Sequence, residues 1–229
     1  MPIVNHATRV ITCKLVYYGP GGSGKTSNLT HLYSALPAGE IGELRSYSTR
    51  RERTLTFEYT PTDLGSIGPY QMRFEICTTP GQSQLQAARE QMLKGADGIA
   101  FIADSRLSAL DENITSLRDL HNILGAQGVS ARSLPFVFQY NKQNFPPDDI
   151  ATIGELSAAL NFRHAPEFGA DAKGGDGVVE TLRSLGTQLL RRLGVGDVAN
   201  EAAASTEIDF ENLDFEMEKF QSPQSEAAA

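Results

Sequence analysis

The sequence lacks the features that mark membrane-inserted and exported proteins. No apolar run approaches the roughly 20 residues that a membrane-spanning helix needs, so we expect no integral membrane segment. The first fifteen residues, MPIVNHATRVITCKL, do not have the basic-then-apolar layout of a signal peptide. The chain also has neither a Met-Gly start nor a prenylation box at its end. These absences predict a cytoplasmic protein.

Cysteine is scarce, with Cys13 and Cys77 the two examples in 229 residues. Each stands in an apolar, strand-like stretch, which favours buried, reduced thiols. Cys13 is expected near the start of one strand and Cys77 near the end of its parallel neighbour. At about 3.3 Å per residue along a strand, this separation argues against a disulfide.

Basic charge is not in excess either. The net charge is −8, and it arises in the last part of the chain. From Gly194 onward nine acidic residues stand against one lysine, which leaves nineteen residues of each sign in the remainder. A neutral body offers no basic face for nucleic acid, so we expect no nucleic-acid partner.

The composition changes near residue 195, which predicts a domain over residues 1–194 and a tail over residues 195–229. The tail is rich in Ala, Ser and acidic residues, as disordered segments are. Within residues 208–220, however, large apolar side chains recur, and four of them fall on one helical face: Phe210, Leu213, Met217 and Phe220. The tail is therefore either a solvated acidic extension or a docking segment for a partner or for the body's own surface.

Apolar strand patterns alternate with helical patterns between residues 10 and 193. Strands are expected at residues 10–18, 54–60, 70–77, 98–104, 134–141 and 165–170, and helices at residues 25–36, up to 94, 107–127, 152–161 and 177–193. Such alternation predicts an α/β fold with a mainly parallel central sheet and helices on both faces. The pair 54–60 and 70–77 reads as a hairpin that adds one antiparallel edge strand. Residues 38–53 are charged and show no clear period.

The stretch GPGGSGKT, from Gly19 to Thr26, matches the phosphate-binding loop pattern Gly-x-x-x-x-Gly-Lys-[Ser/Thr]. It follows a predicted strand and opens a predicted helix, which is the context that the pattern requires. Backbone N–H groups of such a loop surround phosphate oxygens, and the helix N-terminus adds its positive dipole end. The expected nucleotide contacts are Gly19, Gly21, Gly22, Ser23, Gly24, Lys25, Thr26 and Ser27, with Lys25 on the β- and γ-phosphates and Thr26 on Mg²⁺.

Two further breaks leave the carboxyl ends of predicted strands, where ligands of open α/β sheets bind. These breaks are TTPGQ, residues 78–82, and YNKQN, residues 140–144. Together with the phosphate loop and the charged segment between them, they resemble a Ras-like small GTPase. The segments KLVYYGPGGSGKTSNL, MRFEICTTPGQ, GADGIAFIADS and FQYNK are most similar to the MglA family, the bacterial gliding-motility and cell-polarity GTPases. The resemblance covers about residues 1–193.

The resemblance implies a Ras-like P-loop fold, GTP and GDP as ligands, and a Mg²⁺ cofactor. It implies that Thr54 closes over the γ-phosphate and Mg²⁺, that Gln82 orients the attacking water, and that Arg53 acts as an arginine finger supplied within the chain. Gly81, Asn141 and Lys142 are further implied nucleotide contacts, and Asn144 is expected at the base. A roadblock-type, MglB-like partner that promotes hydrolysis is also implied, as is recruitment to a cell pole by partners.

Two positions depart from the pattern of most small GTPases. Thr78 replaces an Asp, as it does in the MglA family, and the loss of that carboxylate predicts weaker Mg²⁺ binding. Asn144 stands where the guanine-reading Asp is expected, and an amide presents one acceptor and one donor instead of a carboxylate. A mismatch of this kind costs about 1–3 kcal/mol.

Several outcomes for the base are open at this stage. Guanine still binds because the phosphates supply most of the affinity, or xanthine is preferred because it carries a carbonyl where guanine has its amino group. Adenine fits only in part, and Asp148 or Asp149 could replace the missing acceptor despite the stiffening by Pro146 and Pro147.

Three functions are compatible with these residues. The favoured one is a switch that hydrolyses GTP, with Lys25, Arg53 and Gln82 as catalytic residues. The second is a nucleotide-binding adaptor that does not hydrolyse and acts through its tail, for which Thr78 and Asn144 are the motive. The third, a P-loop kinase, is weak because no segment reads as a lid or as a second substrate site.

Overall fold

The structure is a computed structural model that describes residues 2–48, 53–62, 66–81 and 85–193. The chain divides into two units, Met1–Asp197 and Val198–Ala229. All described residues belong to the first unit. The predicted docking segment 208–220 lies outside the described residues, as does Gln82.

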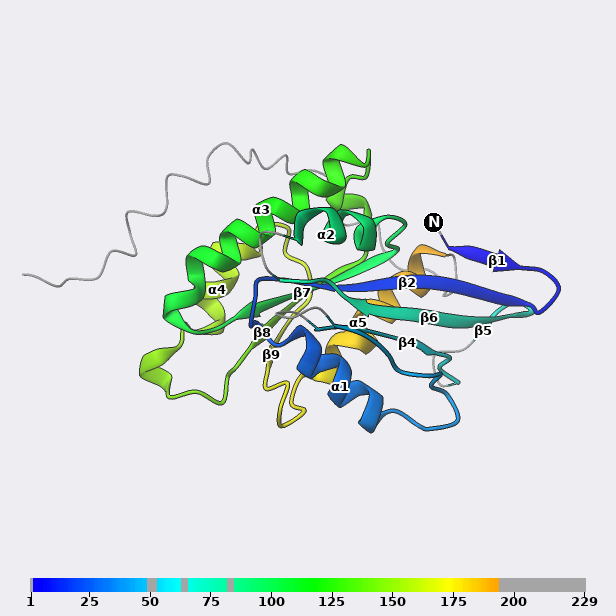
Figure 1. Cartoon of the computed structure of the whole chain (residues 1–229), viewed down its shortest axis with the longest axis horizontal. Coiled ribbons are helices and arrows are strands. Elements are labelled where there is room, and N and C mark those ends of the chain that lie inside the picture. Colours follow the sequence, from blue (N-terminus) through cyan, green and yellow to red (C-terminus); the bar gives the residue numbers. More distant parts are fainter. Residues whose placement is uncertain (1, 49–52, 63–65, 82–84, 194–229) are drawn as a thin grey trace, which may run out of the picture. The chain divides into compact units, whose positions relative to one another are not determined.

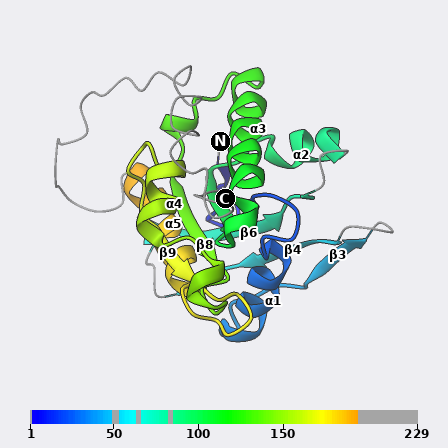
Figure 2. The same ribbon diagram turned by 90° about the vertical axis from the view of Figure 1, so that its left-hand side faces the viewer.

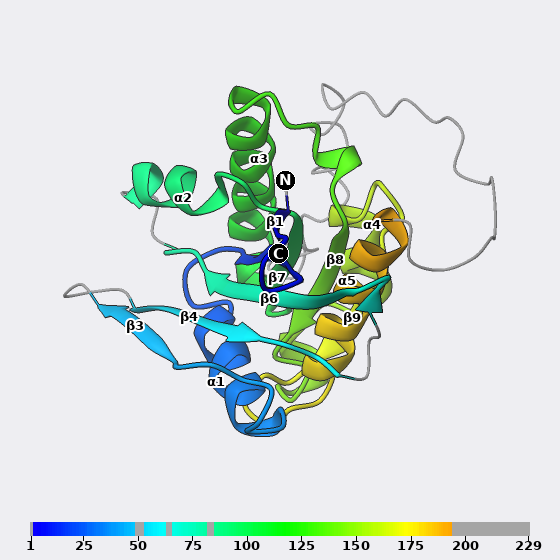
Figure 3. The same cartoon turned by 90° about the vertical axis from the view of Figure 1, so that its right-hand side faces the viewer.

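A single mixed sheet forms the centre of the first unit (Figure 1). Its strands are β1 (Ile3–Asn5), β2 (Val10–Tyr18), β3 (Arg45–Ser48), β4 (Arg53–Tyr59), β5 (Ser66–Ile67), β6 (Tyr70–Thr78), β7 (Gly98–Asp104), β8 (Phe136–Asn141) and β9 (Glu167–Ala170). Their order across the sheet is β3-β4-β6-β2-β7-β8-β9, and β1 and β5 add short antiparallel pairings to β2 and β6. Figures 2 and 3 place β3 and β9 at opposite edges.

Helices cover both faces of this sheet. They are α1 (Lys25–Ala35), α2 (Gln86–Leu93), α3 (Leu110–Ala126), α4 (Ile153–Leu160) and α5 (Val178–Arg192). Helices α1 and α5 pack on one face, and α2, α3 and α4 pack on the other (Figure 1). Five neighbouring strands of the sheet, in the order β6-β2-β7-β8-β9, run parallel. This confirms the predicted α/β architecture of a Ras-like fold.

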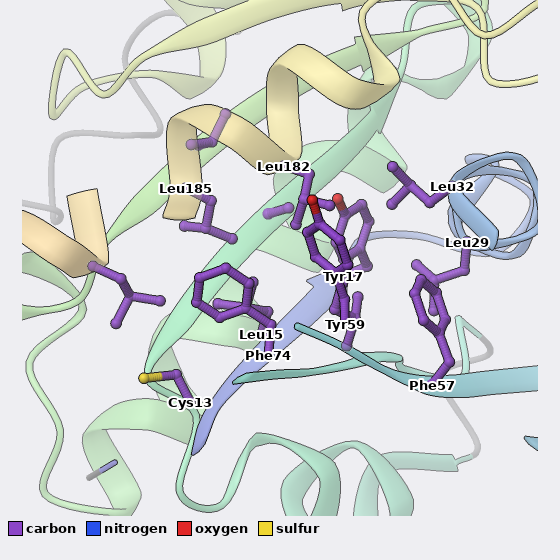
Figure 4. Close-up of a cluster of buried hydrophobic side chains, with 14 of the residues drawn as sticks. Cys13, Leu15, Tyr17, Leu29, Leu32, Phe57, Tyr59, Phe74, Leu182 and Leu185 are labelled. Carbon is purple, nitrogen blue, oxygen red and sulfur yellow. The ribbon is translucent and has the colours of Figure 1, made fainter. Parts of the chain in front are cut away.

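Alternate residues of the central strands feed the two apolar cores. Leu15 and Tyr17 of β2 join the core under α1 and α5, where they meet Leu29 and Leu182 (Figure 4). Val16 and Tyr18 join the core under the other three helices. Because both faces of the strands are covered, their sequences are almost continuously apolar.

The two cysteines are free and buried, as predicted. Cys13 belongs to the core under α1 and α5, whereas Cys77 belongs to the core on the other face. In the β2–β6 register Cys77 lies opposite Val16, three positions along β2 from Cys13. Burial raises the pKa of each thiol to about 12, so both stay protonated and unreactive at neutral pH.

The described elements follow the sequence pattern except at the antiparallel edge. The predicted hairpin is present as β4 and β6, but β3 pairs on the outer side of β4 and is the outermost strand. Strand β3 lies inside the segment 38–53, for which the sequence predicted no element. The predicted helix over 107–127 begins with a 3₁₀ turn at Leu107–Ala109 before α3. Among the described residues, no helix is long and apolar enough to cross a bilayer.

Candidate nucleotide site

The carboxyl ends of the parallel strands lie together along one side of the sheet, called the carboxyl edge, and the predicted motifs meet there. In the strand register Tyr17 lies opposite Thr78, and Asn141 lies opposite both Asp104 and Ala170. Segments that are far apart in the sequence therefore leave the sheet side by side. This is the edge at which open α/β sheets bind their ligands.

The phosphate loop fits this edge only because it contains glycine at two crowded positions. Gly19 has φ +148°, and a Cβ there would lie 2.2 Å from the carbonyl oxygen of Ile102 in β7. Gly24 has φ +102°, and a Cβ there would lie 2.0 Å from the Asn141 amide nitrogen. Any side chain at these positions would displace the loop, so the glycines allow its backbone to form a cradle.

Lys25 closes the cradle from inside. Its Nζ donates to the carbonyl oxygens of Gly19, at 2.8 Å, and Pro20, at 2.6 Å. The residue as a whole is only 6% exposed. Helix α1 begins at Lys25 with no capping side chain and no acidic residue in its first turn, so its amino end is suited to an anion.

The segment after β6 lies directly against the phosphate loop. A Cβ on Gly81 would lie 2.5 Å from Gly21 Cα and 2.9 Å from Lys25 Nζ. Only glycine permits this approach, which brings the Gly81 backbone to the lysine that is expected to bind phosphate. The structure thus brings together Gly21, Lys25 and Gly81, three residues that the sequence analysis assigned to nucleotide binding.

Asn141 connects the phosphate loop with two other segments. Its Nδ2 donates to Ser23 O at 2.7 Å, and its Oδ1 accepts from Ala172 N at 2.8 Å. Asn141 is nearly fully buried. Sequence reasoning missed Ala172, although the predicted strand at 165–170 runs parallel to its neighbour and ends at this same edge.

Lys142 has an unusual backbone and a charged partner. Its φ is +74°, a conformation that non-glycine residues adopt infrequently. Its Nζ lies 2.5 Å from Oδ2 of Asp104 at the end of β7. Burial of Asp104 opposes ionisation, but hydrogen bonds from Arg106 and Lys142 outweigh it and hold the pKa of this carboxyl below its usual value. Asn144 follows in the same loop and is exposed.

The residues of this edge fit a nucleotide with bound Mg²⁺. The crowded glycines form a cradle that any side chain would fill, and Thr26 stands at the second position of α1. Within the described ranges no group of three or more His, Cys, Asp or Glu side chains could hold a metal ion. The hydroxyl of Thr26 is an oxygen ligand of the kind that Mg²⁺ accepts beside phosphate oxygens.

Comparison with known proteins identifies the family. No family model matches the chain. The chain is 41% identical over 196 residues to the mutual gliding-motility protein MglA of Myxococcus xanthus (strain DK1622), a match that covers 86% of this chain and all of that protein. The chain belongs to the MglA family of Ras-like small GTPases.

Two further residues of interest, Thr54 and Thr78, make their described contacts with β3 and β4. Thr54 lies in β4, and its hydroxyl donates to Tyr47 O of β3 at 3.2 Å. The Thr78 hydroxyl is buried and accepts from Leu55 N at 2.9 Å, so it too faces β4. Arg53 opens β4. Gln82 lies outside the described residues, so the predicted roles of Arg53, Thr54 and Gln82 stay predictions.

Proposed function

We propose that this chain is a guanine-nucleotide switch that binds GTP and GDP with Mg²⁺ and hydrolyses GTP to GDP. The observation that carries the proposal is the closed phosphate cradle, in which Lys25 spans the loop and Gly81 lies against it. Membership of the MglA family supports guanine as the base.

The proposed mechanism relies on positioning and on positive charge. Backbone N–H groups of the loop and the Lys25 ammonium bind the phosphates and stabilise the charge that develops on them. Thr26 would help to hold Mg²⁺, which would neutralise further phosphate charge when bound. Gln82 orients the attacking water and Arg53 acts as the finger, while Thr54 closes over the γ-phosphate. For Thr54 this requires its hydroxyl to leave Tyr47 O.

The switch is proposed to reside in residues 38–54 and 78–90. In the GTP form these segments would contact the γ-phosphate and Mg²⁺, and partners would recognise the difference. A roadblock-type, MglB-like protein is the proposed activating partner. A role in gliding motility is suggested by the name of the relative. A role in cell polarity and recruitment to a cell pole are implied by the family resemblance and are part of the same proposal.

Lys25→Ala tests the proposal directly. The variant should lose GDP and GTP binding while the fold survives, because Leu29 and Leu32 still pack α1 on the sheet. Lys14→Ala is the matched control, since Lys14 lies on the same strand-to-helix unit but bonds Lys94 O, away from the cradle. Isothermal titration measures binding and thermal melting checks the fold. Undiminished GDP binding by Lys25→Ala would refute the nucleotide site.

A second candidate function is an adaptor that binds nucleotide without hydrolysing it. Two residues favour it. Asn144 stands in place of the base-reading carboxylate, and the hydroxyl oxygen of Thr78 accepts a hydrogen bond from Leu55 N. Mass analysis of the nucleotide that co-purifies with the chain identifies the base. Single-turnover conversion of GTP to GDP, with and without a roadblock-type partner, then separates the switch from the adaptor.

A further inference from the structure

The carboxylate of Asp104 lies beside residues 141–144, here called the base-reading loop, and forms ion pairs with the side chains of Lys142 and Arg106. Asp104 is 1% exposed. Its Oδ2 lies 2.5 Å from Lys142 Nζ and 2.7 Å from Arg106 Nη2. Arg106 Nε adds bonds of 3.1 and 3.2 Å to the two carboxylate oxygens. The side chains of Lys142 and Arg106 are 18% and 41% exposed, so the anion is the buried member of the cluster.

The backbone of Asp104 is itself fixed. Asn113 of α3, a fully buried residue, accepts from Asp104 N at 2.9 Å and donates to Asp104 O at 2.8 Å. Strand β7 is completely buried along its length. The position of Asp104 is therefore fixed, and its carboxylate can hold a more exposed side chain such as that of Lys142 in one place.

The base-reading loop is tied to its surroundings at three successive residues. Asn141 bonds Ser23 O and Ala172 N, Lys142 bonds Asp104, and Gln143 Nε2 donates to Ser105 Oγ at 2.8 Å. Gln143 N also donates to Ala170 O at 3.0 Å. These ties hold the left-handed backbone of Lys142, a conformation that persists only when its surroundings determine it.

We propose that Asp104 is a positioning residue of the base site. Its carboxylate holds Lys142, and through Lys142 the loop that carries Asn144, in the arrangement that receives the base. The inference rests on the proposed function and concerns the base end of that site. Such a pre-formed loop raises affinity because binding need not order it.

The alternative arrangement makes the opposite prediction. If Lys142 had to leave Asp104 to reach the nucleotide, Arg106 would serve as the reserve partner of the buried carboxylate. Removing the charge of Asp104 would then release Lys142 and tighten binding. In the positioning arrangement, the same substitution loosens the loop and weakens binding.

A double-substitution cycle tests the proposal on the full chain. Asp104→Asn should weaken GDP binding by about tenfold or more, measured by displacement of a fluorescent GDP analogue. The same substitution in a Lys142→Met background should cause little further loss, because the tie is already absent. Asp97→Asn is the matched control, since Asp97 is a buried carboxylate that accepts from Lys14 N at 2.9 Å and precedes β7 at the end opposite to Asp104, and it should leave GDP affinity unchanged. Thermal melting without nucleotide verifies that each variant is folded.

Each outcome decides the inference. A tenfold loss that vanishes in the Lys142→Met background supports it. Unchanged or tighter GDP binding by Asp104→Asn overturns it, as do equal losses in both backgrounds, which would show that Asp104 acts independently of Lys142. These results leave the proposed nucleotide site intact, because the unaltered chain would still bind GDP through Lys25. Failure of the unaltered chain to bind GDP would refute both.

Discussion

Asn144 stands exposed at the end of a loop whose three preceding residues are all tied down. The loop therefore keeps its shape without the carboxylate that normally reads guanine. Asn144→Asp should tighten GTP and GDP binding by at least about tenfold, because it adds a charge-assisted pair of hydrogen bonds to the base. The unaltered chain should bind xanthine nucleotides better, relative to guanine nucleotides, than the variant does.

Calorimetric titration with GDP and with xanthosine diphosphate checks this prediction. Asn122→Asp is the control, because it adds the same charge at an exposed position of α3. Equal GDP affinity of Asn144→Asp and the unaltered chain would show that residue 144 does not face the base.

The predicted catalytic residues Arg53 and Gln82 act on the reaction rather than on binding. Arg53→Ala should slow single-turnover GTP cleavage by up to about 10³-fold if Arg53 is the finger, and Gln82→Ala should also slow it. GTP affinity should change little. Arg45→Ala, which removes an exposed arginine of the neighbouring strand, is the control. An unchanged rate for Arg53→Ala, both alone and with a partner, would show that Arg53 is not the finger.

The sequence predicts those site residues that form contiguous motifs. The phosphate loop and the Asn141-Lys142 pair are local patterns, and the structure places them at one edge of the sheet. Ala172 and Asp104 were missed because their roles depend on side chains 31 and 38 positions away, Asn141 and Lys142. No local pattern records such a contact. It becomes visible only when the register of neighbouring strands is known.

At the scale of elements, helix α2 has an unusual attachment. Its buried residues are Arg89 and Leu93. Arg89 forms a 2.7 Å ion pair with Asp119 of α3, with side chains 5% and 35% exposed. Arg89 also opposes the rise that burial causes in the pKa of Tyr18, the last residue before the phosphate loop. The ion pair between Arg89 and Asp119 thus contributes to holding α2 against α3, a role that apolar packing has in the other helices.

Arg89→Ala should consequently loosen α2 more than the rest of the fold. Because the pair is partly buried, we expect a loss of about 2 kcal/mol in the free energy of unfolding, measured by urea denaturation. Hydrogen exchange should accelerate in Gln86–Leu93 and stay unchanged in α1. Gln91→Ala, at an exposed position of α2, is the control. Equal exchange in the two variants would show that Leu93 alone holds the helix.

Edge elements were harder to predict than central ones. Strands β7 and β8 are buried at every position, and their apolar runs identify them. Among the described residues, strand β3 pairs with β4 alone, and its tyrosine, Tyr47, is 62% exposed and not part of a buried apolar face. Its sequence therefore carries no burial period. The three-residue strand β1 was not predicted for the same reason, because its residues are exposed and Ile3 is 70% exposed.

At the scale of the whole molecule, the two apolar cores lie on the faces of the sheet, and the proposed nucleotide site lies at the carboxyl ends of its parallel strands. Both faces are sealed by helices, so nearly all apolar side chains of the central strands are buried. The carboxyl edge carries the crowded glycines, the buried Lys25 and the Asp104 cluster. Substitution of Lys25 should therefore change binding with little loss of stability, whereas substitutions in the two cores should do the reverse.

The tail is the part of the chain whose function is proposed from composition alone. Only 86% of this chain is matched by the MglA relative, although that protein is matched over its whole length. A spacer needs no large apolar residues, yet residues 208–220 hold six of them, four at helical spacing. We propose that this segment docks on a partner or on the body's surface, and folds as it does so.

Deleting residues 197–229 should leave GDP affinity unchanged, because the phosphate and base loops lie within residues 19–173. The deletion should remove one partner from pull-downs, or one self-contact seen as changed NMR shifts of the body. Replacing Phe210, Leu213, Met217 and Phe220 by Ala in the full chain should have the same effect, since it removes the apolar face and keeps the acidic charge. Replacing Ala202, Ala203 and Ala204 by Ser is the control and should change nothing. If the full chain and the deletion variant recover the same partners, and the tail resonances are equally mobile with and without the body, the segment is a solvated acidic extension and the docking proposal is wrong.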